Sequence, residues 1–188
     1  MTSTTSSAAS APDPLRGAIT RHVRARMRVG ICGSTAPVYE SLCLNVGASP
    51  TSLGFGPIRS ETSLIATMPF ADALSSGARF DCVIAGWAVP QAGMGRFDAI
   101  DPDGDLSLMR LLLRLVTPNG LLMLGVPVGP DLVAYNSCRI YGPLRLPLLL
   151  NGWEEVARRS GLADPSHEEV VQAALILRHA CSAGAASP

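Results

Sequence analysis

Short apolar runs alternate with segments of helical periodicity through the middle of the chain. The runs predict strands at residues 28–32, 51–55, 62–66, 80–85 and 121–126. Apolar side chains at helical spacing predict helices at residues 37–45, 69–75, 102–116 and 152–160. Residues 170–178 fit either a last strand or a terminal helix. Strands that alternate with helices predict an α/β fold with a single doubly wound, mostly parallel sheet.

The helix expected at residues 102–116 has the clearest local signals. Asp101 can cap it, and Pro102 suits the first helical position. Asp103 and Asp105 complement the positive end of its dipole. Its expected buried face consists of four apolar residues at helical spacing, Leu106, Met109, Leu113 and Val116.

The two ends of the chain differ in composition from its middle. Residues 1–27 begin with a stretch rich in Ser, Thr and Ala and continue with an Arg-rich segment, so we expect a disordered or targeting tail. A solvated tail leading into a short helix and an organelle transit peptide are both open interpretations. Residues 28–180 are expected to form the single α/β domain, and residues 181–188 a second disordered tail.

Composition narrows the classes of partner. The 188 residues include 15 basic and 15 acidic ones, so no net charge draws the chain toward nucleic acid. No apolar run reaches the roughly 18 to 20 residues that a membrane span needs. The five cysteines include no CxxC pair, which favours a reducing, cytoplasmic compartment unless the N-terminal tail is a transit peptide. A small-molecule substrate is the expected partner, and the oligomeric state is open.

Ligands of open parallel sheets bind at the carboxyl ends of the strands. The first such loop contains Gly33 and Ser34, where a glycine lets a ligand approach the backbone and the following helix begins. The same strand–glycine–helix turn also occurs for purely structural reasons. We therefore expect a cofactor site here only if neighbouring loops converge on it.

The second loop, residues 86–105, concentrates charge. It contains Arg96, Asp101, Asp103 and Asp105, and the alternating acids resemble part of a calcium loop. The remaining ligands of such a loop are missing, and helix capping explains the acids, so no metal is expected.

The third loop, residues 127–146, is long for an ordinary connection. Its polar residues are Asn136, Arg139, Tyr141 and Arg145. Two arginines and a tyrosine can grip a carboxylate or phosphate, or they can pin this loop to the acids of the second loop. Both interpretations stay open.

Common catalytic motifs are missing from the chain. There is no GxSxG, HExxH or P-loop pattern. The three histidines, His22, His167 and His179, lie outside the candidate loops. Because histidine is the commonest general acid or base, acid–base catalysis is disfavoured.

Four segments carry a resemblance to a known family: GSTAPVYE, GMGRFDAIDPDGDL, LVTPNGLLMLGVPVGPD and NSCRIYGPLRLPLLLNGW, at residues 33–40, 93–106, 115–131 and 136–153. They resemble the family catalogued as domain of unknown function 268, of the class I S-adenosylmethionine-dependent methyltransferase fold. The resemblance implies a Rossmann-like sheet of seven strands with the last strand antiparallel. It also implies a cofactor, S-adenosylmethionine, over Gly33 and Ser34 beside the second loop, where Trp87 lies.

The chain departs from the family pattern at three places. The family has an acid at the end of the second strand, a Glu-His pair before the glycine-rich segment, and Asn-Ala-His before RIYG. The corresponding positions here are Gly54, then Pro90 and Gln91, then Asn136, Ser137 and Cys138.

Three functions follow as hypotheses. The first is a methyltransferase-like enzyme of unknown substrate, since methyl transfer needs mainly the positioning of two reactants. The second is a degenerate, non-catalytic family member that acts as a binding or scaffold protein. The third is a nucleotide or sugar-phosphate binder that uses Arg139 and Arg145. Fold alone does not choose among them.

Overall fold

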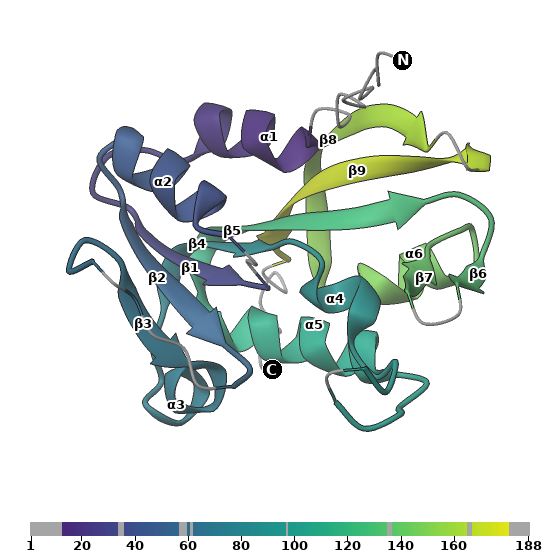
Figure 1. Ribbon diagram of the computed structural model, residues 1–188, viewed down its shortest axis with the longest axis horizontal. Coiled ribbons are helices and arrows are strands. Elements are labelled where there is room, and N and C mark those ends of the chain that lie inside the picture. The colour runs from purple at the N-terminus through teal and green to yellow at the C-terminus, as the bar shows by residue number, and fades with distance from the viewer. Residues whose placement is uncertain are drawn as a thin grey trace, which may run out of the picture.

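The computed structural model describes residues 13–33, 36–56, 60, 62–96, 98–134, 137–164 and 167–180 (Figure 1). Residues 1–12 of the tail expected at residues 1–27, and the whole tail expected at residues 181–188, lie outside these ranges. No helix within the described ranges is long and apolar enough to cross a membrane.

One seven-stranded sheet of order β3-β2-β1-β4-β5-β9-β8 forms the centre of the molecule. Its strands are β1 Arg28–Cys32, β2 Ser49–Gly54, β3 Ala66–Pro69, β4 Phe80–Ala85, β5 Val116–Val128, β8 Trp153–Asp164 and β9 His167–His179. The pairs from β3 to β5 are parallel, whereas β9 runs antiparallel to both β5 and β8. The doubly wound sheet with its antiparallel last strand is thus confirmed.

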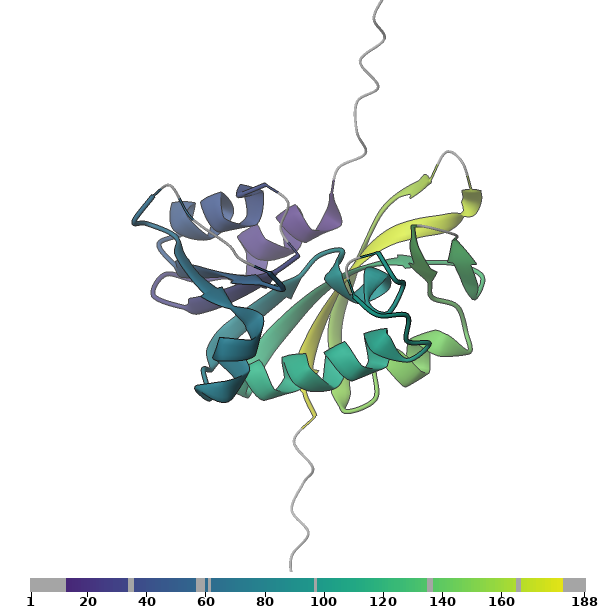
Figure 2. The ribbon, with the colours of Figure 1, turned by 60° about the horizontal axis from the view of Figure 1, so that its bottom comes forward.

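Helices cover both faces of this sheet (Figure 2). One face carries α1 Pro14–His22 and α2 Val38–Asn45, and the other carries α3 Phe70–Ser75 and α5 Gly104–Leu115. Each face has its own apolar core. Because β1 and β4 lie between the two cores, their consecutive residues are buried, which explains why both appear in the sequence as unbroken apolar runs.

The remaining short elements lie beyond the carboxyl ends of β4 and β5. Helix α4 Ala88–Gln91 follows β4, and the antiparallel pair β6 Leu132–Ala134 and β7 Cys138–Ile140 follows β5. Helix α6 Arg145–Leu149 then leads to β8. The long third loop is therefore structured through much of its length.

Two expectations about elements were wrong. The helix expected at residues 152–160 is part of strand β8, which pairs with β9 from Trp153 opposite His179 onward. Pairing with β9, whose residues 173–177 are buried, outweighs local helical spacing here. The strand expected at residues 62–66 starts only at Ala66.

The folded part of the chain also starts earlier than the expected boundary at residue 28. The Asp13 carboxylate accepts a hydrogen bond of 2.9 Å from the backbone N–H of Leu15 and so caps α1. Leu15, Ala18 and Ile19 are buried, and α1 contacts α2, β5, β8 and β9. Their spacing of three and four residues gives α1 one apolar side, which the concentration of arginines in this segment obscures.

We predict that Ile19→Ala lowers the free energy of unfolding by about 2–5 kcal/mol, because it leaves a cavity in the core under α1. The exposed neighbour Thr20 provides the control, and Thr20→Ala should change stability by about 0.5 kcal/mol or less. Urea denaturation of the full chain measures both values. Equal stabilities for the two variants would contradict the packing of α1 in the core.

Candidate functional site

Three glycines emerge side by side at the carboxyl edge of the sheet. Cys32, the last residue of β1, is level with Leu53 of β2 and with Ala85 of β4. The residue that follows each of these three is a glycine. Gly33 and Gly86 come directly after their strands, and Gly54 is the last residue of β2. This edge is where ligands of open parallel sheets bind, and here three adjacent strands present backbone without side chains.

Gly33 is required by the geometry of its turn. Its φ of +72° is unfavourable for other residues, and a Cβ there would lie 2.8 Å from Cβ of Ala88 on α4. A Cβ on Gly86 would lie 3.3 Å from Cε2 of Tyr39 on α2. These close approaches supply a structural reason for both glycines, in addition to any ligand. Ser34, expected beside Gly33 in the cofactor site, lies outside the described residues.

Two exposed aromatic side chains flank the glycines. Trp87 follows Gly86 after β4 and is 44% exposed, and Phe55 follows Gly54 after β2 and is 56% exposed. The ring of Phe55 rests against Phe70, with 4.9 Å between centroids. Trp87 was among the expected site residues, whereas Phe55 was not. Its position directly after a strand end was the available signal.

A buried carboxylate on helix α2 contacts β2. Glu40 of α2 is 2% exposed, and its Oε1 accepts a hydrogen bond of 2.7 Å from the Ser52 hydroxyl. Ser52 lies two residues before Gly54. The Glu40–Ser52 pair therefore joins α2 to β2. Glu40 was not singled out from the sequence, although it ends the segment GSTAPVYE.

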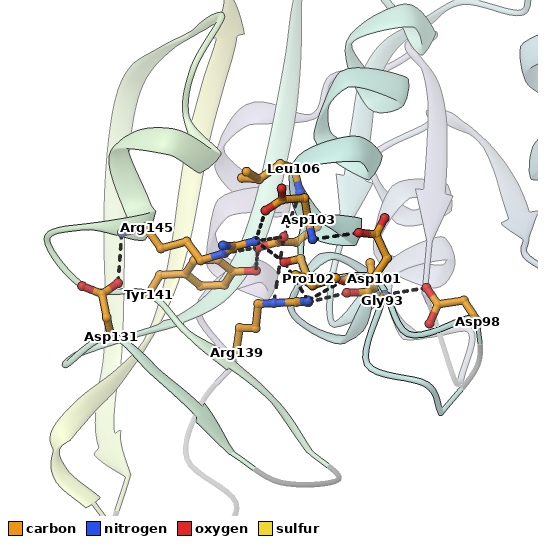
Figure 3. A network of polar contacts seen from close by, with 12 residues as sticks. Gly93, Asp98, Asp101, Pro102, Asp103, Leu106, Asp131, Arg139, Tyr141 and Arg145 are labelled. Atoms are coloured by element: carbon orange, nitrogen blue, oxygen red, sulfur yellow. Dashed lines mark hydrogen bonds and ion pairs between the residues drawn. The ribbon is translucent and has the colours of Figure 1, made fainter.

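The second and third loops are joined through one fully buried carboxylate, that of Asp105. Figure 3 shows its partners Arg139, Tyr141 and Arg145 pointing toward the second loop. Its Oδ2 accepts hydrogen bonds from the Tyr141 hydroxyl at 3.1 Å and from Nε of Arg145 at 3.0 Å. Its Oδ1 accepts one from Nη2 of Arg145 at 2.6 Å and lies 4.0 Å from Nε of Arg139. Arg145 therefore grips the carboxylate with two donors, as guanidinium–carboxylate pairs commonly do.

Arg139 extends the same network into the backbone of the second loop. Its guanidinium donates to the carbonyl oxygen of Ala92, and to those of Asp101 and Pro102 at 2.9 and 3.1 Å. The side chain is almost fully buried. Within this loop Gly93 and Gly104 pack backbone against backbone, since a Cβ on Gly104 would lie 2.7 Å from Cα of Gly93. The GMG and PDGD segments thus form one closed turn held by Arg139.

Asp131 organises the other side of the third loop. Its carboxylate accepts backbone hydrogen bonds from Gly142 and Leu144, both at 2.9 Å, and from Arg145 at 3.0 Å. These donors, that of Leu144 above all, hold the pKa of Asp131 below its ordinary value. The carboxylate therefore fixes the segment that carries Tyr141 and Arg145 into the network.

The structure shows which contacts the expected polar residues make. Arg139, Tyr141 and Arg145 are brought together, and they pin the third loop to the second. Asp103 joins them through Arg145 at 3.3 Å, and Asp101 contributes its carbonyl. Arg96 is exposed on the second loop, and Asn136 lies outside the described residues.

Two assignments at the start of α5 need correction. The helix begins at Gly104 rather than Pro102, and the Asp101 carboxylate accepts from the backbone of Asp103 at 2.9 Å instead of capping the helix. Asp105 is not a surface complement to the dipole but a buried residue. The buried face of α5 is made of Asp105, Leu108, Met109, Leu112 and Leu115. Asp105 stands at helical spacing from these leucines, and that periodicity was the signal for its burial.

The electrostatics of the network do not suit acid–base chemistry. Burial and the neighbouring Asp105 raise the pKa of Tyr141, so its hydroxyl stays a neutral donor. The hydrogen bond to Asp105 raises the pKa of Arg145, which stays charged. At the end of β1, burial raises the pKa of the Cys32 thiol to about 12, which keeps it from acting as a nucleophile near neutral pH. Among the described residues, no group of three or more His, Cys, Asp or Glu could hold a metal ion.

Comparison with known proteins places the sequence of this chain in a family. Residues 28–177 match the model of the family described as Caenorhabditis protein of unknown function, DUF268. No curated protein matches the sequence significantly.

Solved structures share the fold at low sequence identity. One is the 1,6-didemethyltoxoflavin-N1-methyltransferase of Burkholderia thailandensis with bound S-adenosylhomocysteine, with 14% identity, a TM-score of 0.68, and coverage of 88% of this chain and 76% of that one. The N-methyltransferase NodS of Bradyrhizobium japonicum, also in complex with S-adenosylhomocysteine, has 14% identity, a TM-score of 0.62 and coverage of 89% and 84%. The [4+2]-cyclase SpnF has 13% identity, a TM-score of 0.64 and coverage of 89% and 80%. The fold is therefore that of the class I methyltransferases, and the cyclase shows that this fold serves other reactions.

We predict that Asp105→Asn lowers the free energy of unfolding by about 3–5 kcal/mol, because it leaves the buried Arg139 without its countercharge. Asp103 provides a matched control, since it also contacts Arg145 but its side chain is 64% exposed. Asp103→Asn should cost about 1 kcal/mol or less. Chemical denaturation compares the two, and a cost for Asp105→Asn as small as that of the control would show that the network does not stabilise the fold.

The lowered pKa of Asp131 predicts a dependence of stability on pH. Its carboxylate stabilises the fold above the unfolded-state pKa, whose ordinary value is 3.8, and this contribution is lost as pH falls through the lower folded-state pKa. Asp131→Asn should therefore be less stable than the unaltered chain at about pH 6, and the difference should shrink toward about pH 3. Urea denaturation across this range is the measurement. The exposed Asp72 serves as control, and the account fails if the two asparagine variants follow the same pH profile.

Proposed function

The chain belongs to the family described as Caenorhabditis protein of unknown function, DUF268, and we propose that it binds S-adenosylmethionine and transfers the methyl group to a small molecule. The observation that carries the proposal is the register that sets Gly33, Gly54 and Gly86 side by side at the carboxyl edge of β1, β2 and β4. The fold is shared with methyltransferases that were crystallised with S-adenosylhomocysteine.

The proposed cofactor site consists of Gly33 and Ser34 after β1 and Trp87 after β4. Bare backbone at the glycines allows close approach, and the indole of Trp87 offers a half-exposed aromatic surface. Aromatic faces attract both flat rings and cations, and S-adenosylmethionine has an adenine ring and a sulfonium cation. Phe55 adds a second exposed ring after β2, where the acid that would hold a ribose is replaced by Gly54.

The residues of the chain contribute positioning rather than proton transfer. S-adenosylmethionine supplies an electrophilic methyl group when bound, and its transfer needs a correctly placed acceptor more than a strong base. The Asp105 network holds the second and third loops in one arrangement beside the strand ends. A rigid loop pair of this kind can orient an acceptor without itself titrating near neutral pH.

The second candidate is a degenerate, non-catalytic family member that acts as a binding or scaffold protein. Gly54 in place of an acid at the end of β2, and the Pro90 and Gln91 pair before the glycine-rich segment, favour it. The third hypothesis, a binder of nucleotide or sugar phosphate through Arg139 and Arg145, loses its support, because both guanidinium groups are committed to Asp105 and to loop carbonyls.

Isothermal titration of the full chain with S-adenosylmethionine tests the proposal. We expect saturable binding, and we expect Trp87→Ala to weaken it by about tenfold through loss of roughly 1.4 kcal/mol of ring contact. Val156→Ala is the control. Val156 is similarly exposed at 41%, but it belongs to β8, which β5 and β9 separate from β4 in the sheet.

Two outcomes separate the candidates. Binding of the cofactor together with label transfer from methyl-labelled S-adenosylmethionine to a small-molecule extract supports the enzyme. Binding without transfer to any extract supports the non-catalytic candidate. Absence of heat at millimolar cofactor contradicts the proposed enzyme and leaves the scaffold candidate.

A further inference from the structure

A depression of about 610 Å³ lies between the second and third loops, apart from the three glycines. Its walls come from the β6–β7 pair, from α6 and from the closed turn that the GMG and PDGD segments form, called the Gly93 turn. The volume falls within the range of sites for small molecules. The function proposed above does not use this depression, and the inference below does not depend on a bound methyl donor.

Exposed apolar side chains gather around this depression. Nine large hydrophobic residues are exposed in the described part of the chain, and five of them line the depression. Four belong to the third loop and α6, and one to the second loop: Leu132, Val133, Leu144, Leu148 and Ile100. Single exposed hydrophobic residues need no explanation, but a contiguous group around a hollow marks a binding surface. Keeping these five side chains in water is unfavourable unless a ligand covers them.

The charged residues that line the depression already have hydrogen-bond partners within the protein. The Asp131 carboxylate accepts three backbone hydrogen bonds. Arg139 and Arg145 donate to Asp105 and to carbonyl groups of the second loop. A charged ligand would have to compete with these bonds, whereas an uncharged one meets only the apolar walls.

The lining also indicates the shape of the ligand. Apart from Gly93 and Pro102, the apolar residues are Leu, Ile, Val and Met, and no aromatic ring belongs to the described lining. Flexible aliphatic walls without a stacking partner suit an aliphatic chain better than a flat ring. We infer that the depression between the Gly93 turn, β6–β7 and α6 is a binding site for an uncharged, predominantly aliphatic small molecule.

Nile red displacement in the full chain tests this inference. The neutral dye should bind saturably, and dodecan-1-ol should displace it at lower concentration than either dodecanoate or dodecylammonium, because the charged side chains of the walls would have to give up hydrogen bonds to meet a charged ligand. Equal displacement by all three, or preference for either charged compound, would overturn the assignment of an uncharged ligand.

Two matched variants locate the site. Leu148→Glu places a charge at the rim, where Leu148 is 58% exposed, and it should weaken dye binding at least tenfold. Leu64→Glu makes the same change at a residue that is 68% exposed and lies outside the depression, and it should keep the affinity within twofold. Equal effects of the two variants would overturn the location, and their melting temperatures show whether each is folded.

Vesicles of neutral phosphatidylcholine distinguish a lipid surface from a single ligand. Sedimentation of the chain with vesicles, without displacement of dye by dodecan-1-ol below its solubility limit, would mean that the apolar rim contacts a membrane and would overturn the inference. Dye binding in the absence of any S-adenosylmethionine binding would contradict only the proposed function. Cofactor binding without dye binding would contradict only the present inference.

Discussion

The buried carboxylate of Asp105 is the interaction on which the arrangement of the loops depends. An uncompensated charge in the core is costly, so Asp105 has to be met by Arg139, Tyr141 and Arg145 in their present places. Those three residues belong to a segment far along the chain, beyond β5. One charge on α5 therefore fixes the position of both the Gly93 turn and the RIYG segment relative to the sheet.

This constraint separates two regions that could hold ligands. On one side, the ends of β1, β2 and β4 offer bare backbone and the exposed rings of Phe55 and Trp87. On the other side, the loops that the network joins enclose an aliphatic hollow. Because the charges of the network are satisfied internally, neither region gains a free cation or anion from it. The chemistry available is therefore contact, stacking and positioning, which agrees with the lack of a histidine among the described residues at the carboxyl ends of β1, β2 and β4.

The sequence predicted most of the sheet and offered the pairing of the loops as one of two interpretations, and particular residues show why it failed elsewhere. Strands β1 and β4 are buried on both faces, so composition alone identified them. Residues 152–160 have helical spacing, and only the presence of β9 beside them makes them a strand. The sequence placed Arg139 and Arg145 among acids but could not decide between a ligand and the protein itself as their partner. The choice between these partners depends on Asp105, whose side chain faces the core. The buried face of α5 is shifted by one residue from the face that the apolar spacing predicted.

The most direct test of the account is to follow backbone and indole N–H signals of the isotope-labelled full chain by NMR during titration with S-adenosylhomocysteine. We predict shifts that saturate for Gly33, Gly86 and the Trp87 indole, with little change for Glu154 and Arg178, which lie level with Leu121 toward the amino ends of the parallel strands. Shifts confined to the loops around Asp105, or none at millimolar ligand, would contradict the claim that the strand-end glycines form the cofactor site.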